Sequence, residues 1–281
     1  MILMQRVDVP RRKDALSSIK LNKTVAPQLE GINDDVVLHD AETGEVVAAQ
    51  IVMPALNDVG RELARHLRFA KLPWTDPNGT LTKNERLSGI GANTIAVGYT
   101  APNKMYKRYA AKLAPVHIEA KPTGDLLYKV VESLWTTFQE ILPEQAAAHD
   151  ELTRSQLHSD WLLQDTPFSS GIINDNAVLP YHKDAGNIKD AWSMMLVLRR
   201  DVDGGCLHVP EYDSTFAVPD LSGLFFCGQR LPHGVTPLIR RSRNAYRYSI
   251  VYYTKAMLRD CGSAADELRR AQIAATVRAA K

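Results

Sequence analysis

The fold is decided by five short runs in the second half of the chain: FSSGIIND (168–175), WSMMLVLRR (192–200), GGCLHVPEY (204–212), GLFFCGQ (223–229) and RYSIVYYT (247–254). Each run is rich in β-branched, aromatic or other apolar residues, and turn-forming residues separate one run from the next. Short strands at this spacing favour a sandwich or a jelly roll over a parallel sheet. We therefore predict an α+β protein whose core is a double-stranded β-helix (a jelly roll, cupin-like) over about residues 165–255.

Two stretches upstream of these strands have helical spacing. The segment PALNDVGRELARHLRFAKL (54–72) begins with a proline and repeats apolar residues every three or four positions, ending at Phe69. The segment TGDLLYKVVESLWTTFQEIL (123–142) carries a longer apolar stripe. Such a stripe is more typical of a core-facing helix than of a binding surface. We predict N-terminal helices that flank the jelly-roll core.

The rest of the chain suggests three parts. Residues 1–55 form an N-terminal extension, in which VVLHDAETGEVVAAQIVM (36–53) has the pattern of a β-hairpin. Residues 56–260 form the main domain, and residues 261–281 form a C-terminal helix or tail. The length of 281 residues is adequate for one large domain with a sizeable core.

Composition excludes some classes of protein. No run of apolar residues is long enough to cross a membrane, and the start of the chain lacks a secretory core, so we expect no membrane association. The default location is cytoplasmic, in a bacterial or phage-infected cell, or nuclear if the source is eukaryotic. Three cysteines without CxxC spacing indicate neither a disulfide framework nor a zinc site.

The net charge of +2 is small, but basic residues are unevenly placed. The segment 228–247 holds five arginines and no acid, and APNKMYKRYAAK (101–112) interleaves lysines and an arginine with tyrosines. Such patches suit a phosphate backbone. An ordinary solvated face is an equally weighted alternative.

His182, Asp184 and His233 have the pattern of a facial metal site, His-x-Asp followed about fifty positions later by His. Side chains two positions apart in an extended segment point the same way, so His182 and Asp184 can reach one ion together. His233 stands in RLPHGVTP (230–237), where a strand is expected to turn. Two imidazoles and a carboxylate without thiolate favour Fe(II) and leave positions open for oxygen and a co-substrate.

Arg247 is a candidate for binding that co-substrate. A guanidinium binds a carboxylate through two hydrogen bonds, and an arginine on a strand near His233 could hold the distal carboxylate of 2-oxoglutarate. Ser249 points to the same side of the strand and could add a hydroxyl. The alternative for Arg247 is a structural ion pair.

Four motifs resemble the TET/JBP family of 2-oxoglutarate and Fe(II)-dependent dioxygenases, which oxidise the 5-methyl group of pyrimidines in nucleic acid. They are HKDAGN (182–187), GGCLHVPEY (204–212), LPHGVTP (231–237) and RYSIVYY (247–253). PFSSGIINDNAVLPYHKDAGN (167–187) is similar to the animal TET stretch that runs from Pro-Phe-Ser into the HxD motif and ends on Asn. The similarity covers about residues 86–255, and the compact form looks like the short microbial or phage members.

The resemblance implies a role for individual residues. His182, Asp184 and His233 would be the catalytic iron ligands, and 2-oxoglutarate would be bound by Arg247 and Ser249, with Arg86 as an upstream arginine. Asn187 and Tyr253 would contact the target base, with Lys183 of the same motif beside them. Contacts to the nucleic-acid backbone are assigned to Lys104, Tyr106, Lys107, Arg108, Arg240, Arg241 and Arg243.

Two features depart from animal TET enzymes. Three scattered cysteines cannot supply their Cys-rich zinc-binding segment, and Thr254 and Lys255 stand where those enzymes carry a histidine soon after the stacking tyrosine. The main hypothesis is hydroxylation of 5-methylcytosine in DNA to 5-hydroxymethylcytosine, on a flipped or single-stranded base, with no obligate protein partner. The alternatives are thymine hydroxylation to 5-hydroxymethyluracil and a 2-oxoglutarate hydroxylase of a protein or small molecule. A non-catalytic nucleic-acid-binding module is a third class.

Overall fold

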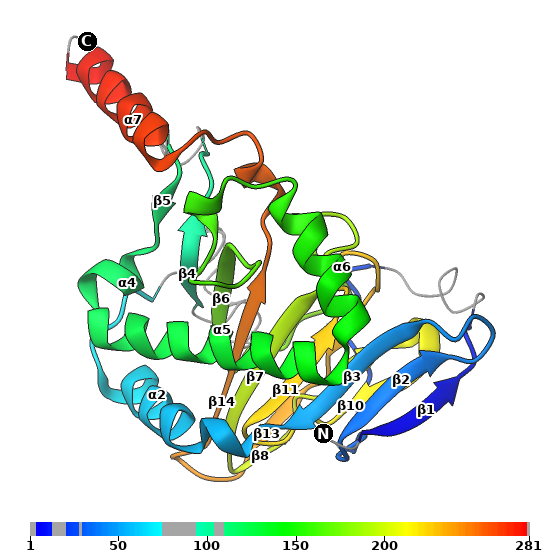
Figure 1. The fold of residues 1–281 in the computed structure, drawn as a ribbon. Coiled ribbons are helices and arrows are strands. Elements are labelled where there is room, and N and C mark those ends of the chain that lie inside the picture. The colour runs from blue at the N-terminus through cyan, green and yellow to red at the C-terminus, as the bar shows by residue number, and fades with distance from the viewer. Residues whose placement is uncertain (1–3, 13–20, 28–29, 75–93, 104–109, 280–281) are drawn as a thin grey trace.

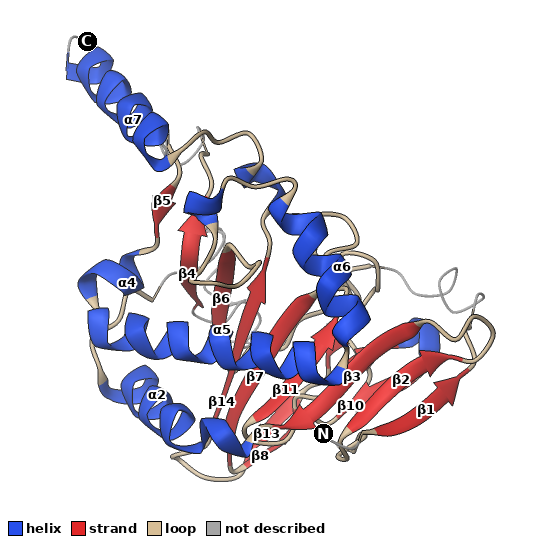
Figure 2. Ribbon diagram, in the orientation of Figure 1, coloured by secondary structure: helices blue, strands red, loops and turns tan. Residues whose placement is uncertain are grey.

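The fold is taken from a computed structural model, which describes residues 4–12, 21–27, 30–74, 94–103 and 110–279. Most of the strands belong to one large twisted sheet, and most of the helices lie on one of its faces (Figure 1). Figure 2 shows the same division between the strand layers and the helical layer. No helix in the described ranges is long and apolar enough to cross a bilayer.

The large sheet has nine strands in the order β1-β2-β3-β11-β7-β14-β6-β4-β5. A three-stranded sheet, β10-β9-β12, and the pair β13-β8 complete the strand structure that is described. The strands are β1 (Gln5–Val9), β2 (Val36–Asp40), β3 (Val46–Val52), β4 (Thr94–Thr100), β5 (Lys112–Leu113), β6 (Ser170–Asp175), β7 (Ser193–Arg200), β8 (Val202–Gly204), β9 (Leu207–Val209), β10 (Ser214–Phe216), β11 (Ser222–Phe226), β12 (Gly234–Val235), β13 (Leu238–Arg240) and β14 (Tyr246–Tyr253).

Strand β7 shows why the large sheet is covered on both faces. Its side chains alternate, so Leu196 and Leu198 pack into a core under the helices, whereas Met195 and Val197 pack into a second core. The second core also contains Leu207 of β9, so the small sheet covers the face opposite the helices. The arrangement is a sandwich of the kind that the sequence predicts.

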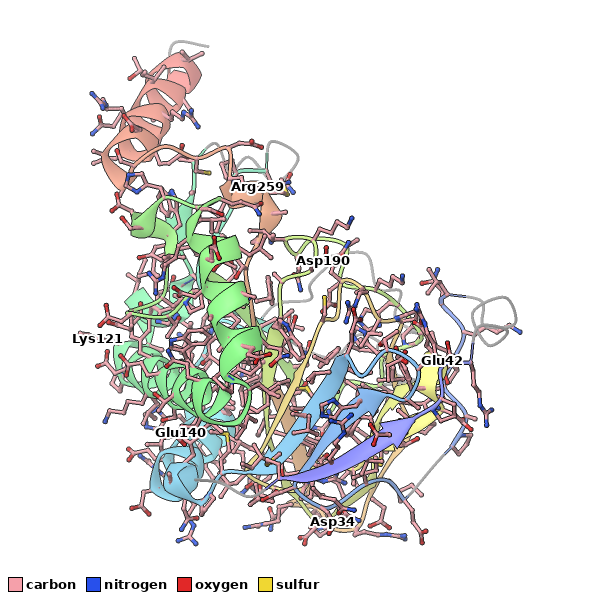
Figure 3. The ribbon with its side chains drawn as sticks, turned by 45° about the vertical axis from the view of Figure 1, so that its right-hand side comes forward. Asp34, Glu42, Lys121, Glu140, Asp190 and Arg259 are labelled. Atoms are coloured by element: carbon pink, nitrogen blue, oxygen red, sulfur yellow. The ribbon has the colours of Figure 1, made fainter. Side chains whose placement is uncertain are left out.

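The helical layer matches the predicted amphipathic segments. The helices are α2 (Asn57–Phe69), α4 (Pro115–Glu119), α5 (Lys121–Ile141), α6 (Pro143–Arg154) and α7 (Ala264–Ala279). Helix α5 buries its apolar stripe against the sheet, while Lys121 and Glu140, near its two ends, lie at the surface (Figure 3). Phe69, expected within the stripe of α2, is 73% exposed because it is the last residue of that helix.

The two ends of the chain join the body in different ways. The predicted hairpin is present as β2 and β3, and β3 pairs with β11, so it widens the large sheet. Helix α7 projects away from the body (Figure 1), and its buried Glu267 accepts a hydrogen bond from the Ala111 amide. The division of the chain at residues 55 and 260 stays a prediction.

Candidate metal centre and the pocket beside it

The two histidines of the predicted metal site are joined through their backbones. The amide of His182 donates to the carbonyl of His233 at 2.9 Å, and the amide of His233 donates back at 3.0 Å. This two-bond bridge places the imidazole rings side by side, with their centroids 4.3 Å apart. The amide of Asp184 donates to the carbonyl of Gly228 at 3.0 Å, which brings the carboxylate to the same place.

The side chains of this group converge on one point. Oδ1 of Asp184 lies 3.6 Å from Nε2 of His182 and 3.9 Å from Nε2 of His233, and one ligand atom from each residue lies within 4.8 Å of the others. Nδ1 of each ring faces a backbone carbonyl, Pro180 at 2.8 Å for His182 and Leu231 at 2.9 Å for His233. A carbonyl only accepts, so each Nδ1 carries the hydrogen and each Nε2 keeps its lone pair for a metal. This donor set fits Fe(II).

The carboxylate of Asp184 is held by neighbours on its second oxygen. The Asn187 amide group donates to Oδ2 of Asp184 at 3.4 Å and to Oγ of Ser193 at 3.2 Å. A Cβ atom placed on Gly228 would lie 2.2 Å from Oδ2, so only glycine leaves room for the carboxylate. Ser193 and Gly228 were missed from the sequence, where both read as ordinary strand and turn residues.

The charges of the site favour metal binding. Burial lowers the pKa of His233 and keeps its imidazole neutral. Burial alone would raise the pKa of Asp184, but the interactions with His182 and His233 outweigh it, so the pKa is lowered. Burial opposes protonation of His182, yet its contact with Asp184 and its bond to Pro180 raise its pKa. The carboxylate is therefore ionised at neutral pH, as a ligand must be.

A pocket of about 350 Å³ opens beside the metal ligands. Its lining includes Asn187, Tyr253 and Ser249, all predicted site residues, and also Lys255. Burial and the charge of Asp184 raise the pKa of Tyr253 to about 12, so its phenol stays neutral. The other lining residues are Ile172, Asn174, Leu179, His182, Asp184, Gly186, Met195, Leu207, Phe226, His233, Val235 and Val251.

Arg247 is buried on the same strand face as Ser249. Its side chain is 1% exposed, and Nε and Nη2 have no hydrogen-bond partner among the described residues. Burial, with the charge of Arg199, lowers the pKa of Arg247 to about 10, which leaves the guanidinium charged at neutral pH. No carboxylate of the described residues pairs with it, so the structural ion pair is not observed there. An unpaired buried guanidinium two residues from the pocket wall fits a carboxylate ligand.

Comparison with known proteins gives matches in sequence and in fold, although no family model matches. A stretch of 137 residues, 49% of the chain, is 28% identical to the bifunctional helicase and thymine dioxygenase JBP2 of Trypanosoma brucei brucei (strain 927/4 GUTat10.1). The JBP2 of Leishmania braziliensis is 26% identical over 132 residues, 47% of the chain. Each match spans only 12% of the length of the JBP2 protein.

The solved structure of NgTET1 in complex with 5mC DNA superposes on the chain with a TM-score of 0.58 and 14% identity. That match covers 93% of this chain and 94% of the other. The chain is thus similar in sequence to JBP2 over about half of its length, and similar in fold to NgTET1 over nearly all of it. The match to NgTET1 also confirms the predicted jelly-roll fold. Because the sequence identity is only 14%, the match is evidence for the fold and for nothing further.

The predicted DNA-backbone arginines of this chain lie apart from the pocket. Arg240 ends β13, which pairs with β8, and Arg241 forms an ion pair with Asp203. Both are close to the start of β14, whereas Tyr253 ends that strand. Arg243 is exposed in the following turn, and Lys183 is exposed beside the metal ligands but does not line the pocket. These assignments stay predictions.

Five further predicted residues fall outside the described ranges, so their positions are not assigned. They are Arg86, Lys104, Tyr106, Lys107 and Arg108.

Proposed function

We propose that this chain hydroxylates the 5-methyl group of 5-methylcytosine in DNA, giving 5-hydroxymethylcytosine. The reaction consumes 2-oxoglutarate and O₂ and releases succinate and CO₂, with one oxygen atom entering the methyl group and the other entering succinate. The observation that carries the proposal is the converged His-Asp-His group in the wall of one pocket, together with a buried Arg247 that has two unpaired nitrogens among the described residues and lies two positions before Ser249 of the same wall.

The chain would hold two cofactors at fixed places. His182, Asp184 and His233 would bind Fe(II), and Arg247 with Ser249 would bind the distal carboxylate of 2-oxoglutarate. When bound, these cofactors supply the oxidising power needed to hydroxylate an unactivated C–H bond. The protein aligns the two ends, because the backbone bridge fixes the imidazoles and β14 carries Arg247, Ser249 and Tyr253 on one rigid strand.

A methyl group inside a duplex cannot reach a recessed metal, so the target base must be flipped out or single-stranded. Flipping costs a few kcal/mol, on the order of one lost stacking and pairing step. Tyr253 would offset part of that cost by stacking on the base, since its ring lines the pocket and its phenol is neutral. The Asn187 amide group is engaged by Asp184 and Ser193, so its oxygen is the atom that would meet the base.

Thymine is the second candidate substrate, and one lining residue favours it. Lys255 lines the pocket two positions after Tyr253. An ammonium group only donates hydrogen bonds, which matches the O4 acceptor of thymine and not the N4 amino group of cytosine. The JBP2 relatives are named thymine dioxygenases, in agreement with that candidate.

The test is incubation of the protein with Fe(II), 2-oxoglutarate, ascorbate and DNA that contains cytosine, 5-methylcytosine or thymine, followed by mass spectrometry of the nucleosides. A single added oxygen on 5-methylcytosine supports the proposal, and the same change on thymine selects the second candidate. If no base is oxidised and succinate forms only with a peptide or a metabolite, the substrate is not DNA. The three DNAs should be tested as duplex and as single strand, because only a flipping enzyme oxidises both.

A further inference from the structure

Arg199 makes an unusual set of hydrogen bonds close to Arg247. It lies near the end of β7, and its guanidinium donates to three backbone carbonyls, those of Val202, Gly204 (2.9 Å) and Ala217 (3.0 Å). Its own amide donates to a side-chain oxygen of Asp220 at 2.7 Å. A planar guanidinium that bonds three carbonyls fixes the backbone that carries them, here strand β8 up to its turn into β9 and the residue that follows β10.

That turn forms a wall against the Arg247 side chain. Gly204 and Gly205 both have positive φ angles, +66° and +63°, and the Gly205 amide donates to the carbonyl of Pro237 at 3.2 Å. A Cβ atom on Gly205 would lie 2.8 Å from Cδ and 2.9 Å from Nε of Arg247. The turn therefore touches the guanidinium arm directly, and the lack of a side chain at Gly205 gives that arm its space.

The guanidinium groups of Arg199 and Arg247 differ in their hydrogen bonding. They are opposite each other in the register of β7 and β14. The guanidinium of Arg199 is engaged by carbonyl oxygens, whereas Nε and Nη2 of Arg247 are buried without partners among the described residues. Arg199 therefore stabilises the backbone around it, whereas Arg247 has N–H groups available to bind an anion.

We propose that Arg199 is a positioning residue for Arg247. By fixing the wall Val202–Gly205, Arg199 sets the place of the Arg247 guanidinium and so the affinity of the pocket for the distal carboxylate of a 2-oxo dicarboxylic acid. The inference rests on the proposed function, in which Arg247 binds 2-oxoglutarate.

The test compares two ligands that both chelate a metal ion but differ in whether they have a distal carboxylate. Calorimetry in the presence of Mn(II) gives the dissociation constants of 2-oxoglutarate, which has a distal carboxylate, and oxalate, which has none. For Arg199→Lys, which keeps the charge but lacks the planar fork that holds three carbonyls in fixed directions, we expect about a 10-fold weaker binding of 2-oxoglutarate, equivalent to about 1.4 kcal/mol, and unchanged binding of oxalate. Arg200→Lys, at the exposed neighbouring position, is the matched control and should change neither.

A second variant acts on the same wall without touching Arg199. Gly205→Ala puts a methyl group against Arg247, at a position whose φ of +63° also strains any residue with a side chain. It should show the same selective loss, and it keeps the inference testable if Arg199→Lys does not fold. A general loss of structure would weaken both ligands alike.

Equal 2-oxoglutarate-to-oxalate ratios in wild type, Arg199→Lys and Gly205→Ala would overturn the positioning role and leave the proposed function standing. If Arg247→Met has the same 2-oxoglutarate-to-oxalate ratio as the wild type, Arg247 does not bind the distal carboxylate. In that case the proposed function fails, and the positioning role fails with it.

Discussion

The two ends of β14 are built on opposite principles. At the Tyr253 end, the metal ligands are held by hydrogen bonds to Pro180, Leu231 and Gly228, and each Nδ1 of the two imidazoles has a partner. At the Arg247 end, beyond Ser249 and Val251 of the pocket wall, a buried guanidinium has two nitrogens without a partner among the described residues. We call these the metal end and the arginine end.

The difference shows where the free energy of ligand binding comes from. The metal end is pre-organised, so an ion meets ligands that need no rearrangement. The arginine end carries a charge that burial destabilises, so a carboxylate that arrives there relieves an existing cost as well as making new bonds. The metal end thus fixes the positions of the metal ligands, and the arginine end provides the affinity for an anion.

The largest expected effect comes from breaking the metal end. Asp184→Ala removes the carboxylate that both imidazoles face, and we expect metal affinity to fall by more than about 100-fold, since loss of an outer-shell partner alone costs about 10–100-fold. The measurement is calorimetric titration with Mn(II), together with the nucleoside assay. Lys189→Ala, at an exposed position in the same loop, is the control. Retained metal binding in Asp184→Ala would show that the ion binds elsewhere.

Removing the charge at the arginine end should have effects of opposite sign on stability and binding. In Arg247→Met, the unliganded protein should gain about 1–3 kcal/mol in free energy of unfolding, because an uncompensated buried charge is replaced by an apolar chain of similar length. Binding of 2-oxoglutarate should weaken by about 30-fold or more, since a hydrogen bond to a charged group contributes about 1.5–3 kcal/mol. Urea unfolding and calorimetry measure the two quantities. A less stable Arg247→Met protein would show that the guanidinium is compensated in the unliganded state.

A smaller effect should follow from crowding the metal end without removing a ligand. In Gly228→Ala, the new methyl group would lie 2.2 Å from Oδ2 of Asp184 and must displace the carboxylate. We expect a 10–100-fold loss of metal affinity, about the size seen for outer-shell partners, and no loss at the arginine end. Gly186 lies in the loop that carries Asp184, and a Cβ added there would meet no described atom within 4 Å, so Gly186→Ala tests whether a glycine change near the site is enough to lower metal affinity. Equal metal affinities in both variants would contradict the crowding argument.

Gly228 also shows how far the sequence could predict this site. His182 and Asp184 were predictable because the two-residue period of an extended chain puts both side chains on one side, and the HxD spacing needs nothing else. Gly228 and Ser193 were not, because their roles depend on which strands are neighbours, and local pattern does not encode strand order. The role of Asn187 as a partner of Asp184 required the fold for the same reason.

The basic run at residues 240–243 illustrates the same limit. It was assigned to the DNA backbone because the segment 228–247 is rich in arginine and contains no acid. The pairing of β13 with β8 places Arg240 beside the start of β14, at the arginine end. The helices α2 and α5, by contrast, were predictable in position because their apolar periodicity is local.

The last prediction concerns the loss of folding stability at low pH. It distinguishes a loss caused by buried histidines of the helical layer from a loss caused by the metal end. His149 and His117 lie in the helical layer, and each accepts a backbone N–H, from Trp192 at 3.2 Å and from Gly98 at 2.9 Å, so both must be neutral. Burial lowers the pKa of His149 to about 3 and that of His117 to about 4, below the usual 6.5. Between these values the unfolded chain binds more protons, so stability is complete above pH 6.5 and falls as the pH drops.

Each of these two histidines should contribute a loss of about 1.4 kcal/mol per pH unit between pH 6 and pH 4.5. Urea unfolding without metal, at several pH values, measures the slope, and His149→Gln, which keeps an acceptor but cannot titrate, should remove its share. An unaltered slope in His149→Gln would show that His149 does not cause the acid sensitivity. It would leave His117 and the metal end as its source, and at the metal end the lowered pKa of His233 acts in the same direction while the raised pKa of His182 opposes it.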